Sequence, residues 1–311
     1  MLPESASGKK DSVYGFIVSD SVSVSPMQMA KLLETLGKII RELKSIQQDY
    51  VRAKVFGYRF RYLLDFDQLF PQLWPEIARG SRAAFASTRE LLWSSSGPQF
   101  SLPPGAMAEL AFHLSKDRAQ FKEHRGAVTS LIANPFYRTL VEQGTLQEGT
   151  TAFHFSQQMR EHVRSLRSTD ARLGQLDEMF ASRKLTLVED QVSPNLLLFS
   201  KLVEEIERQS KGTTRGHLQN RADSYNYALA DSLSTRKAQD SREIYVLVTS
   251  SPVLLGVLSK PEYKWHRDPL RTTGLVFSNP HSLVRTPSEV MFLTRLLGSS
   301  YIDQHKLLMA V

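Results

Sequence analysis

The sequence predicts an α/β protein with a mostly parallel sheet, and three observations carry that prediction. Residues 244–249 form an almost continuous apolar run, which is typical of a strand buried on both faces of a parallel sheet. Residues 58–64 alternate and then become apolar, and the acids Asp65 and Asp67 follow that run at once. Long stretches with helical periodicity separate the two segments. A hydrophobic fraction of 41% in 311 residues is enough for the core that such a fold requires.

The chain begins with a serine-rich segment, residues 1–26, which we expect to be a flexible tail. Residues 27–57 are predicted to form a long helix, because apolar side chains recur at alternating spacings of four and three residues. These side chains are Leu32, Leu36, Ile39, Leu43 and Ile46. The stripe indicates a helix packed on its own domain or, across residues 27–55, a helix that pairs two copies of the chain or binds another protein.

The main domain is expected across residues 58–299. Within it, residues from about 117 to 215 are helical and charged, and we interpret them as an insertion. Residues 300–311 are expected to add a C-terminal amphipathic helix.

Within the main domain, Pro103 and Pro104 indicate a helix start, because proline is tolerated in the first helical turn. A later helix is expected to begin near His217 and to lead into the apolar strand at residues 244–249. Residues 275–277 are predicted as the last strand of the sheet.

The composition excludes several kinds of site. No cysteine is present, which rules out disulfides, thiolate zinc ligands and cysteine nucleophiles. The histidines lack a zinc-binding spacing, and no Gly-x-Ser-x-Gly elbow indicates a serine hydrolase. The net charge of +7 is compatible with a polyanionic partner such as nucleic acid. No signal peptide or membrane-spanning stretch is recognisable, so we expect a cytoplasmic protein without a membrane partner.

Four acids lie where a parallel sheet concentrates its chemistry. Asp65 and Asp67 follow the carboxyl end of a predicted strand, and open α/β sheets bind ligands outside that edge. Glu109 and Asp223 lie on predicted helices that can reach the same edge. Clustered carboxylates are the ligands that Mg²⁺ or Mn²⁺ prefers. We therefore predict a Mg²⁺ or Mn²⁺ site formed by Asp65, Glu109 and Asp223, with Asp67 as a further metal ligand.

This order of segments resembles the PIN-like nuclease superfamily. In that family a first strand ends in an aspartate that is followed two residues later by Asn or Asp, a glutamate lies on a later helix, and a third acid precedes another strand. The matching segments are residues 64–67, 102–110, 220–228 and 246–251. The resemblance implies a three-layer α/β/α sandwich. It also implies a metal-dependent endonuclease that hydrolyses RNA or single-stranded or structured DNA, with Asp65, Glu109 and Asp223 as catalytic residues.

One position departs from the family pattern. The last aspartate of the family would fall at Ser250 or Ser251, and neither side chain carries a charge. Three carboxylates can still hold one Mg²⁺ that keeps most of its waters, and Asp67 can supply part of the missing charge. The alternative interpretation is a catalytically degenerate PIN-like module that binds nucleic acid or a protein partner without cleaving.

Other residues are predicted to surround the acids. Asn226 lies one turn after Asp223 and is expected to position a phosphate or a water. Thr249, Ser250 and Ser251 are expected to line the site as hydrogen-bond partners.

A segment that mixes cations with aromatic rings follows the apolar strand. Lys260, Lys264 and Arg267 are predicted to neutralise phosphates, and Trp265 to stack on a base. The alternative is that Trp265 fills the edge of the core and that the charges are solvated.

Structural interpretations of the acids remain open as well. Asp65 or Asp67 can cap the helix that follows, and Glu109 can pair with His113 one turn later. A third interpretation of the chain is an α-rich interaction protein, in which the N-terminal helix drives assembly and the acids lie at the surface.

Overall fold

The chain is described from a computed structural model. The described residues are 25–74, 88–92, 98–120, 151–152, 171–211, 216–263 and 283–298. The chain divides into two compact units, residues 1–44 and residues 45–311. Helix α1 (Pro26–Val55) contributes its first part to one unit and its last part to the other. The sheet and the candidate site belong to the second unit.

The second unit is built on a five-stranded sheet, and every strand pairing among the described residues is parallel. The strands lie in the order β3-β2-β1-β4-β5. Their bounds are Arg59–Leu64 for β1, Phe100–Leu102 for β2, Leu185–Leu187 for β3, Glu243–Val248 for β4 and Val284–Arg285 for β5. The prediction of an α/β fold with a mostly parallel sheet is therefore confirmed.

The central strands β1 and β4 have the longest shared register. They are paired from Arg59 opposite Glu243 to Leu64 opposite Val248. All residues of β4 from Ile244 onward are buried, as the apolar run predicted. Such a run requires that helices cover both faces of the sheet.

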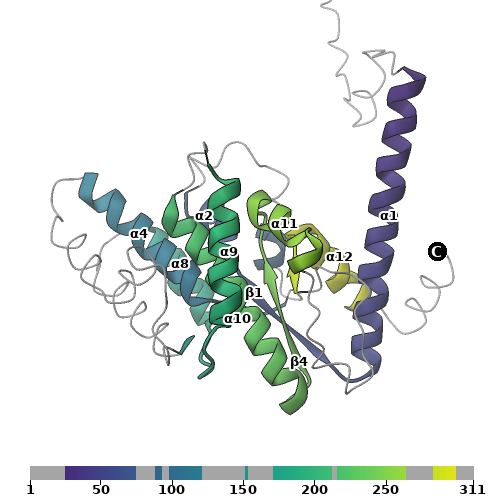
Figure 1. Ribbon diagram of the computed structural model, residues 1–311. Coiled ribbons are helices and arrows are strands. Elements are labelled where there is room, and N and C mark those ends of the chain that lie inside the picture. Colours follow the sequence, from purple (N-terminus) through teal and green to yellow (C-terminus); the bar gives the residue numbers. More distant parts are fainter. Residues whose placement is uncertain are drawn as a thin grey trace, which may run out of the picture. The chain divides into compact units, whose positions relative to one another are not determined.

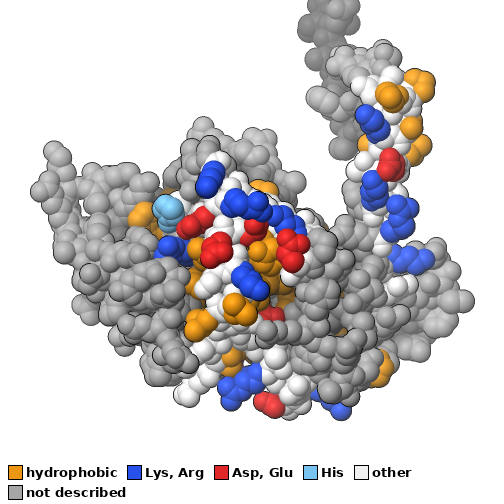
Figure 2. All heavy atoms as spheres, in the orientation of Figure 1, with side chains coloured by type: hydrophobic (Ala, Val, Ile, Leu, Met, Phe, Trp, Pro, Cys, Tyr) orange, Lys and Arg blue, Asp and Glu red, His pale blue; other side chains and the backbone are white. Residues whose placement is uncertain are grey.

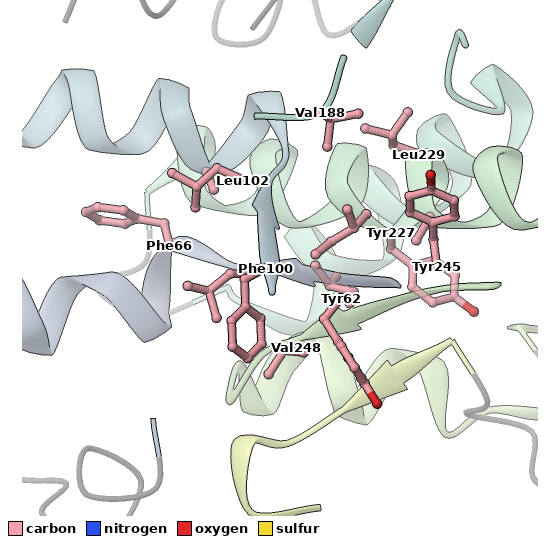
Figure 3. Packing of buried hydrophobic residues seen from close by; sticks show 14 of the residues in the cluster. Tyr62, Phe66, Phe100, Leu102, Val188, Tyr227, Leu229, Tyr245 and Val248 are labelled. Carbon is pink, nitrogen blue, oxygen red and sulfur yellow. The ribbon is translucent and has the colours of Figure 1, made fainter. Parts of the chain in front are cut away.

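Helices do cover both faces. On one face, α10 (His217–Asp240) packs against β4, α9 (Leu196–Gln209) and α4 (Pro104–Gln120) (Figure 1). On the other face, Tyr50 of α1 stacks on Phe60 of β1, with ring centroids 4.0 Å apart. Figure 3 shows Tyr227 on one side of the sheet and Tyr62 on the other. The arrangement is compatible with three α/β/α layers.

The remaining described helices connect or flank these elements. They are α2 (Phe66–Leu73), α8 (Ala171–Ala181), α11 (Pro252–Leu258), the 3-10 turn η3 (Pro261–Tyr263) and α12 (Pro287–Gly298). No helix among the described residues is long and apolar enough to cross a bilayer.

Helix α1 confirms the helix predicted at the N-terminus, but its two ends differ in their surroundings. Tyr50 and Ala53, near its C-terminal end, are fully buried. Leu32, the first residue of the predicted apolar stripe, is 51% exposed, and its neighbours Leu33 and Ile40 are exposed too. The last turns of α1 therefore pack within the second unit.

Two parts of the sheet differ from the sequence predictions. No strand was predicted where β2 forms, because three residues are too few to show a period. The strand β3 and the helix α9 both fall within residues 117–215, the range interpreted as an insertion. In the structure β3 pairs with β2, and α9 packs on α10.

Three further predicted segments lie outside the described residues. These are the tail, except for its last two residues, the strand predicted at residues 275–277, and the C-terminal helix predicted at residues 300–311.

Candidate metal centre

Asp65 lies between β1 and α2, at the carboxyl edge of the sheet. It caps α2, because its Oδ1 accepts a hydrogen bond from the backbone N–H of Phe66 at 3.0 Å. The same oxygen accepts from Nδ2 of Asn226, also at 3.0 Å. The capping role that was the alternative for Asp65 is thus present. It does not remove Asp65 from the acidic group, because the side chain is only 1% exposed and lies against two other acids.

Glu109 and Asp223 reach Asp65 from two different helices, α4 and α10. Each of the three acids offers a carboxylate oxygen, and these oxygens lie within 4.8 Å of one another. Glu109 and Asp223 are each 4% exposed. The interpretation that placed these acids at the surface is therefore wrong. The structure brings together the three residues that the sequence predicted as metal ligands.

The acidic group lies at a reversal of the strand order. β1 and β4 are neighbours in the sheet, but the chain forms β2 and β3 between them. The connections after β1 and β4 leave in opposite directions, and ligands of open parallel sheets bind at such points. Asp65 follows β1, and the loop of residues 249–251 follows β4.

Asp67 lies beside the three acids but points its oxygens elsewhere. Its Oδ2 accepts from the backbone N–H of Ser250 at 2.7 Å and from Oγ1 of Thr249 at 3.1 Å. Its Oδ1 accepts from Nε2 of Gln68 at 2.7 Å. The group of acids that could hold a metal ion contains Asp65, Glu109 and Asp223 without Asp67. Asp67 therefore holds the loop after β4 in place.

The acids influence one another electrostatically. Burial raises the pKa of Asp67 well above its usual range, and the negative charges of Asp65 and Asp223 raise it further. Negative charges removed from water are costly unless a positive charge lies nearby. A divalent cation held by Asp65, Glu109 and Asp223 would supply that charge, so the donor set fits a hard cation such as Mg²⁺ or Mn²⁺.

The loop after β4 carries hydroxyl groups beside the acids. Oγ of Ser251 donates to Oδ2 of Asp223 at 2.8 Å and accepts from the backbone N–H of Leu254 at 3.3 Å. Oγ1 of Thr249 accepts from the backbone N–H of Ser251 at 3.0 Å. The predicted positions of Thr249, Ser250 and Ser251 beside the acids are thus observed, and Ser251 orients Asp223 without adding charge.

Two supporting residues were missed by the sequence analysis. Gln68 is only 3% exposed, and its Oε1 accepts from Oγ1 of Thr88 at 2.8 Å while its amide holds Asp67. A glutamine on the buried face of an amphipathic helix is the signal that could have identified it. No local pattern points to Thr88, which lies 20 residues away in the chain.

The predicted nucleic-acid segment is described only at its start. Nζ of Lys260 forms an ion pair with Glu205, which Arg208 also contacts at 2.6 Å. Lys260 therefore links the segment after α11 to α9. Lys264, Trp265 and Arg267 lie outside the described residues. Figure 2 shows basic and acidic side chains intermixed on the face that it presents, with no single-sign patch among the coloured residues.

Comparisons with protein-family models, with curated proteins and with solved structures found no match.

Proposed function

We propose that the protein is a metal-dependent nuclease that hydrolyses phosphodiester bonds of RNA or of single-stranded or structured DNA. One observation carries the proposal: three buried carboxylates, one directly after β1, one on α4 and one on α10, meet within 4.8 Å at the strand-order reversal of a parallel sheet. The resemblance of the same acids to the PIN-like pattern and the net charge of +7 support it.

In this proposal each site residue has a defined task. Asp65, Glu109 and Asp223 hold the divalent ion, which when bound polarises a phosphoryl oxygen and lowers the pKa of water. Asn226 keeps Asp65 in its orientation, and Ser251 does the same for Asp223. These hydrogen bonds fix the ligand oxygens before the ion binds, which reduces the reorganisation needed on binding.

The direct test incubates the purified chain with end-labelled single-stranded RNA and DNA in Mg²⁺, Mn²⁺ or EDTA, beside Asp65→Asn. Asparagine caps a helix as well as aspartate does, so α2 should still form in the variant. We expect cleavage that requires metal and falls about a hundredfold or more in Asp65→Asn. The matched control is Asp240→Asn, because Asp240 is an exposed acid at the end of α10. Undiminished cleavage by Asp65→Asn would exclude this site.

A second function is favoured by the hydroxyl group of Ser251 beside Asp223. One fewer negative charge weakens the hold on a cation, so a degenerate module that binds nucleic acid or a protein partner without cleaving it is the alternative. This alternative predicts no cleavage together with nucleic-acid binding that weakens steeply as salt rises. If the chain neither cleaves nor binds nucleic acid, a module that binds a protein partner would be the remaining form of this alternative.

A further inference from the structure

Gly105 lies where α4 packs on α10 without room for a side chain. A Cβ atom at this position would lie 2.3 Å from Oδ1 of Asn226 and 2.8 Å from the backbone oxygen of Ala222, whereas ordinary contact begins at 3.4 Å. The second of these neighbours is backbone and cannot rotate away. Any larger residue must therefore move α4 relative to α10, even if Asn226 is displaced.

The same helix faces carry two of the three predicted metal ligands. Glu109 lies one turn after Gly105 on α4, and Asp223 lies three residues before Asn226 on α10. Residues three or four apart share a helix face. The contact of Gly105 with α10 and the contact of Glu109 with Asp223 are thus neighbouring parts of the same α4–α10 interface.

Asn226 connects this contact to the third ligand. Its Nδ2 donates to Oδ1 of Asp65, although the two residues are 161 positions apart in the sequence. Its Oδ1, which faces Gly105, is buried and has no hydrogen-bond partner among the described residues. A buried amide oxygen without a partner lowers stability, so the placement of Asn226 calls for a reason other than folding.

We infer that Gly105 and Asn226 are a positioning pair that sets the spacing of Asp65, Glu109 and Asp223, an inference that rests on the proposed metal site. Mg²⁺ demands near-ideal octahedral geometry, with oxygens at about 2.0–2.1 Å, whereas Ca²⁺ accepts longer and more variable distances of about 2.3–2.6 Å. A shift of α4 by a fraction of an ångström should therefore weaken Mg²⁺ binding more than Ca²⁺ binding.

The test measures Mn²⁺ binding to the full chain by electron paramagnetic resonance, with Mg²⁺ and Ca²⁺ as competitors. We expect Gly105→Ala to bind Mn²⁺ about tenfold more weakly than wild type and to lose preference for Mg²⁺ over Ca²⁺. The matched control is Gly174→Ala in α8, where a Cβ meets nothing within 4 Å. If the variant only contains less folded protein, its binding of all three cations falls by the same factor. The ratio of the Mg²⁺ affinity to the Ca²⁺ affinity therefore distinguishes a changed ligand geometry from a loss of stability.

A second variant keeps the inference testable if Gly105→Ala fails to fold. Asn226→Ala removes the hydrogen bond to Asp65 without adding atoms, and it should also weaken Mn²⁺ binding. Both changes disrupt the same contact, so their effects should not add. The loss of Mn²⁺ affinity in the double variant should therefore be smaller than the product of the losses in the two single variants. Wild-type Mn²⁺ affinity and an unchanged Mg²⁺/Ca²⁺ ratio in the folded variants would overturn the positioning role alone. A wild-type chain that binds no Mn²⁺ would instead remove the metal site, and this role with it.

Discussion

At the scale of single residues, Ser251 has two tasks that a charged side chain could also perform. It caps α11 through Leu254, and it donates a hydrogen bond to Asp223. Aspartate is as good a helix cap as serine. Replacement by aspartate would therefore keep the local fold and add a carboxylate beside Asp223.

We predict that Ser251→Asp has a lower melting temperature than wild type in EDTA and a larger rise on addition of Mn²⁺. The added carboxylate repels buried Asp223 when no cation is present and binds the cation when one is. Differential scanning calorimetry with and without Mn²⁺ measures both effects. Ser251→Asn is the control, since it caps the helix without charge. An equal response to Mn²⁺ in the two variants would contradict the prediction.

A second residue-scale prediction concerns pH. The pKa of Asp67 is raised above its unfolded value near 3.8, first by burial and then by Asp65 and Asp223. A carboxyl group with a raised folded-state pKa contributes stability that is complete below the unfolded pKa and is lost as pH rises through the folded pKa. In EDTA, the melting temperature of wild type minus that of Asp67→Asn should therefore decrease from about pH 4 to pH 8. A difference that stays constant or grows would refute this.

At the scale of elements, an ion pair joins α9 to the segment after α11. Glu205 on α9 contacts both Arg208 and Lys260, and hydrogen bonds from these two cations lower the pKa of Glu205 to about 2. A lowered carboxyl pKa contributes stability that is present above the unfolded value near 4.5 and is lost as pH falls through about 2. The group is close to solvent, so the contribution is small.

We predict that Glu205→Gln lowers the free energy of unfolding by about 1 kcal/mol or less at pH 7. The loss should shrink toward pH 3 and in high salt, because protonation and screening both remove the ion pair. Urea denaturation at the two pH values measures it. Glu204→Gln, an exposed position on the same helix, is the control. A loss that does not change with pH or salt would show that the charge of Glu205 is irrelevant.

At the scale of the whole molecule, α1 presents exposed apolar side chains that are available to pack against a second copy of the chain. Leu33 and Ile40 are 62% and 59% exposed, and burial of a leucine-sized side chain stabilises by about 1.5–3 kcal/mol. A helical segment without tertiary packing is only marginally stable in water. Pairing of two copies through α1 therefore stays a prediction, and Leu33 and Ile40, which lie outside the predicted stripe, add exposed apolar surface to this helix.

If α1 pairs two copies, light scattering should report a dimer for wild type and a monomer for the double variant Leu33→Glu, Ile40→Glu. Charged residues at these two positions would be buried in the pair, and the cost of burying them would separate the copies. Lys38→Gln, on an exposed part of the same helix, is the control. Deletion of residues 27–57 is unsuitable, because it removes the buried Tyr50 and Ala53. A monomeric wild type would contradict the prediction.

The sequence by itself determined the fold class and the identity of the clustered acids. An apolar run such as that of β4 needs no knowledge of its neighbours to indicate a parallel strand. An acid directly after such a strand, as at Asp65, must lie at the carboxyl edge of the sheet. These features are local in the chain. The helices with Glu109 and Asp223 were predicted to reach the same edge from the order of the segments along the chain, and the three acids do lie together.

Only the tertiary structure decided how the site is held together. The hydrogen bond from Asn226 to Asp65, the fit of Gly105 against α10 and the bond from Ser251 to Asp223 each join segments far apart in the sequence. The membership of β3 in the sheet was decided in the same way, by pairing with β2. Hydrogen bonds and close packing between distant segments depend on distances in space, and a one-dimensional pattern of residues carries no measure of those distances.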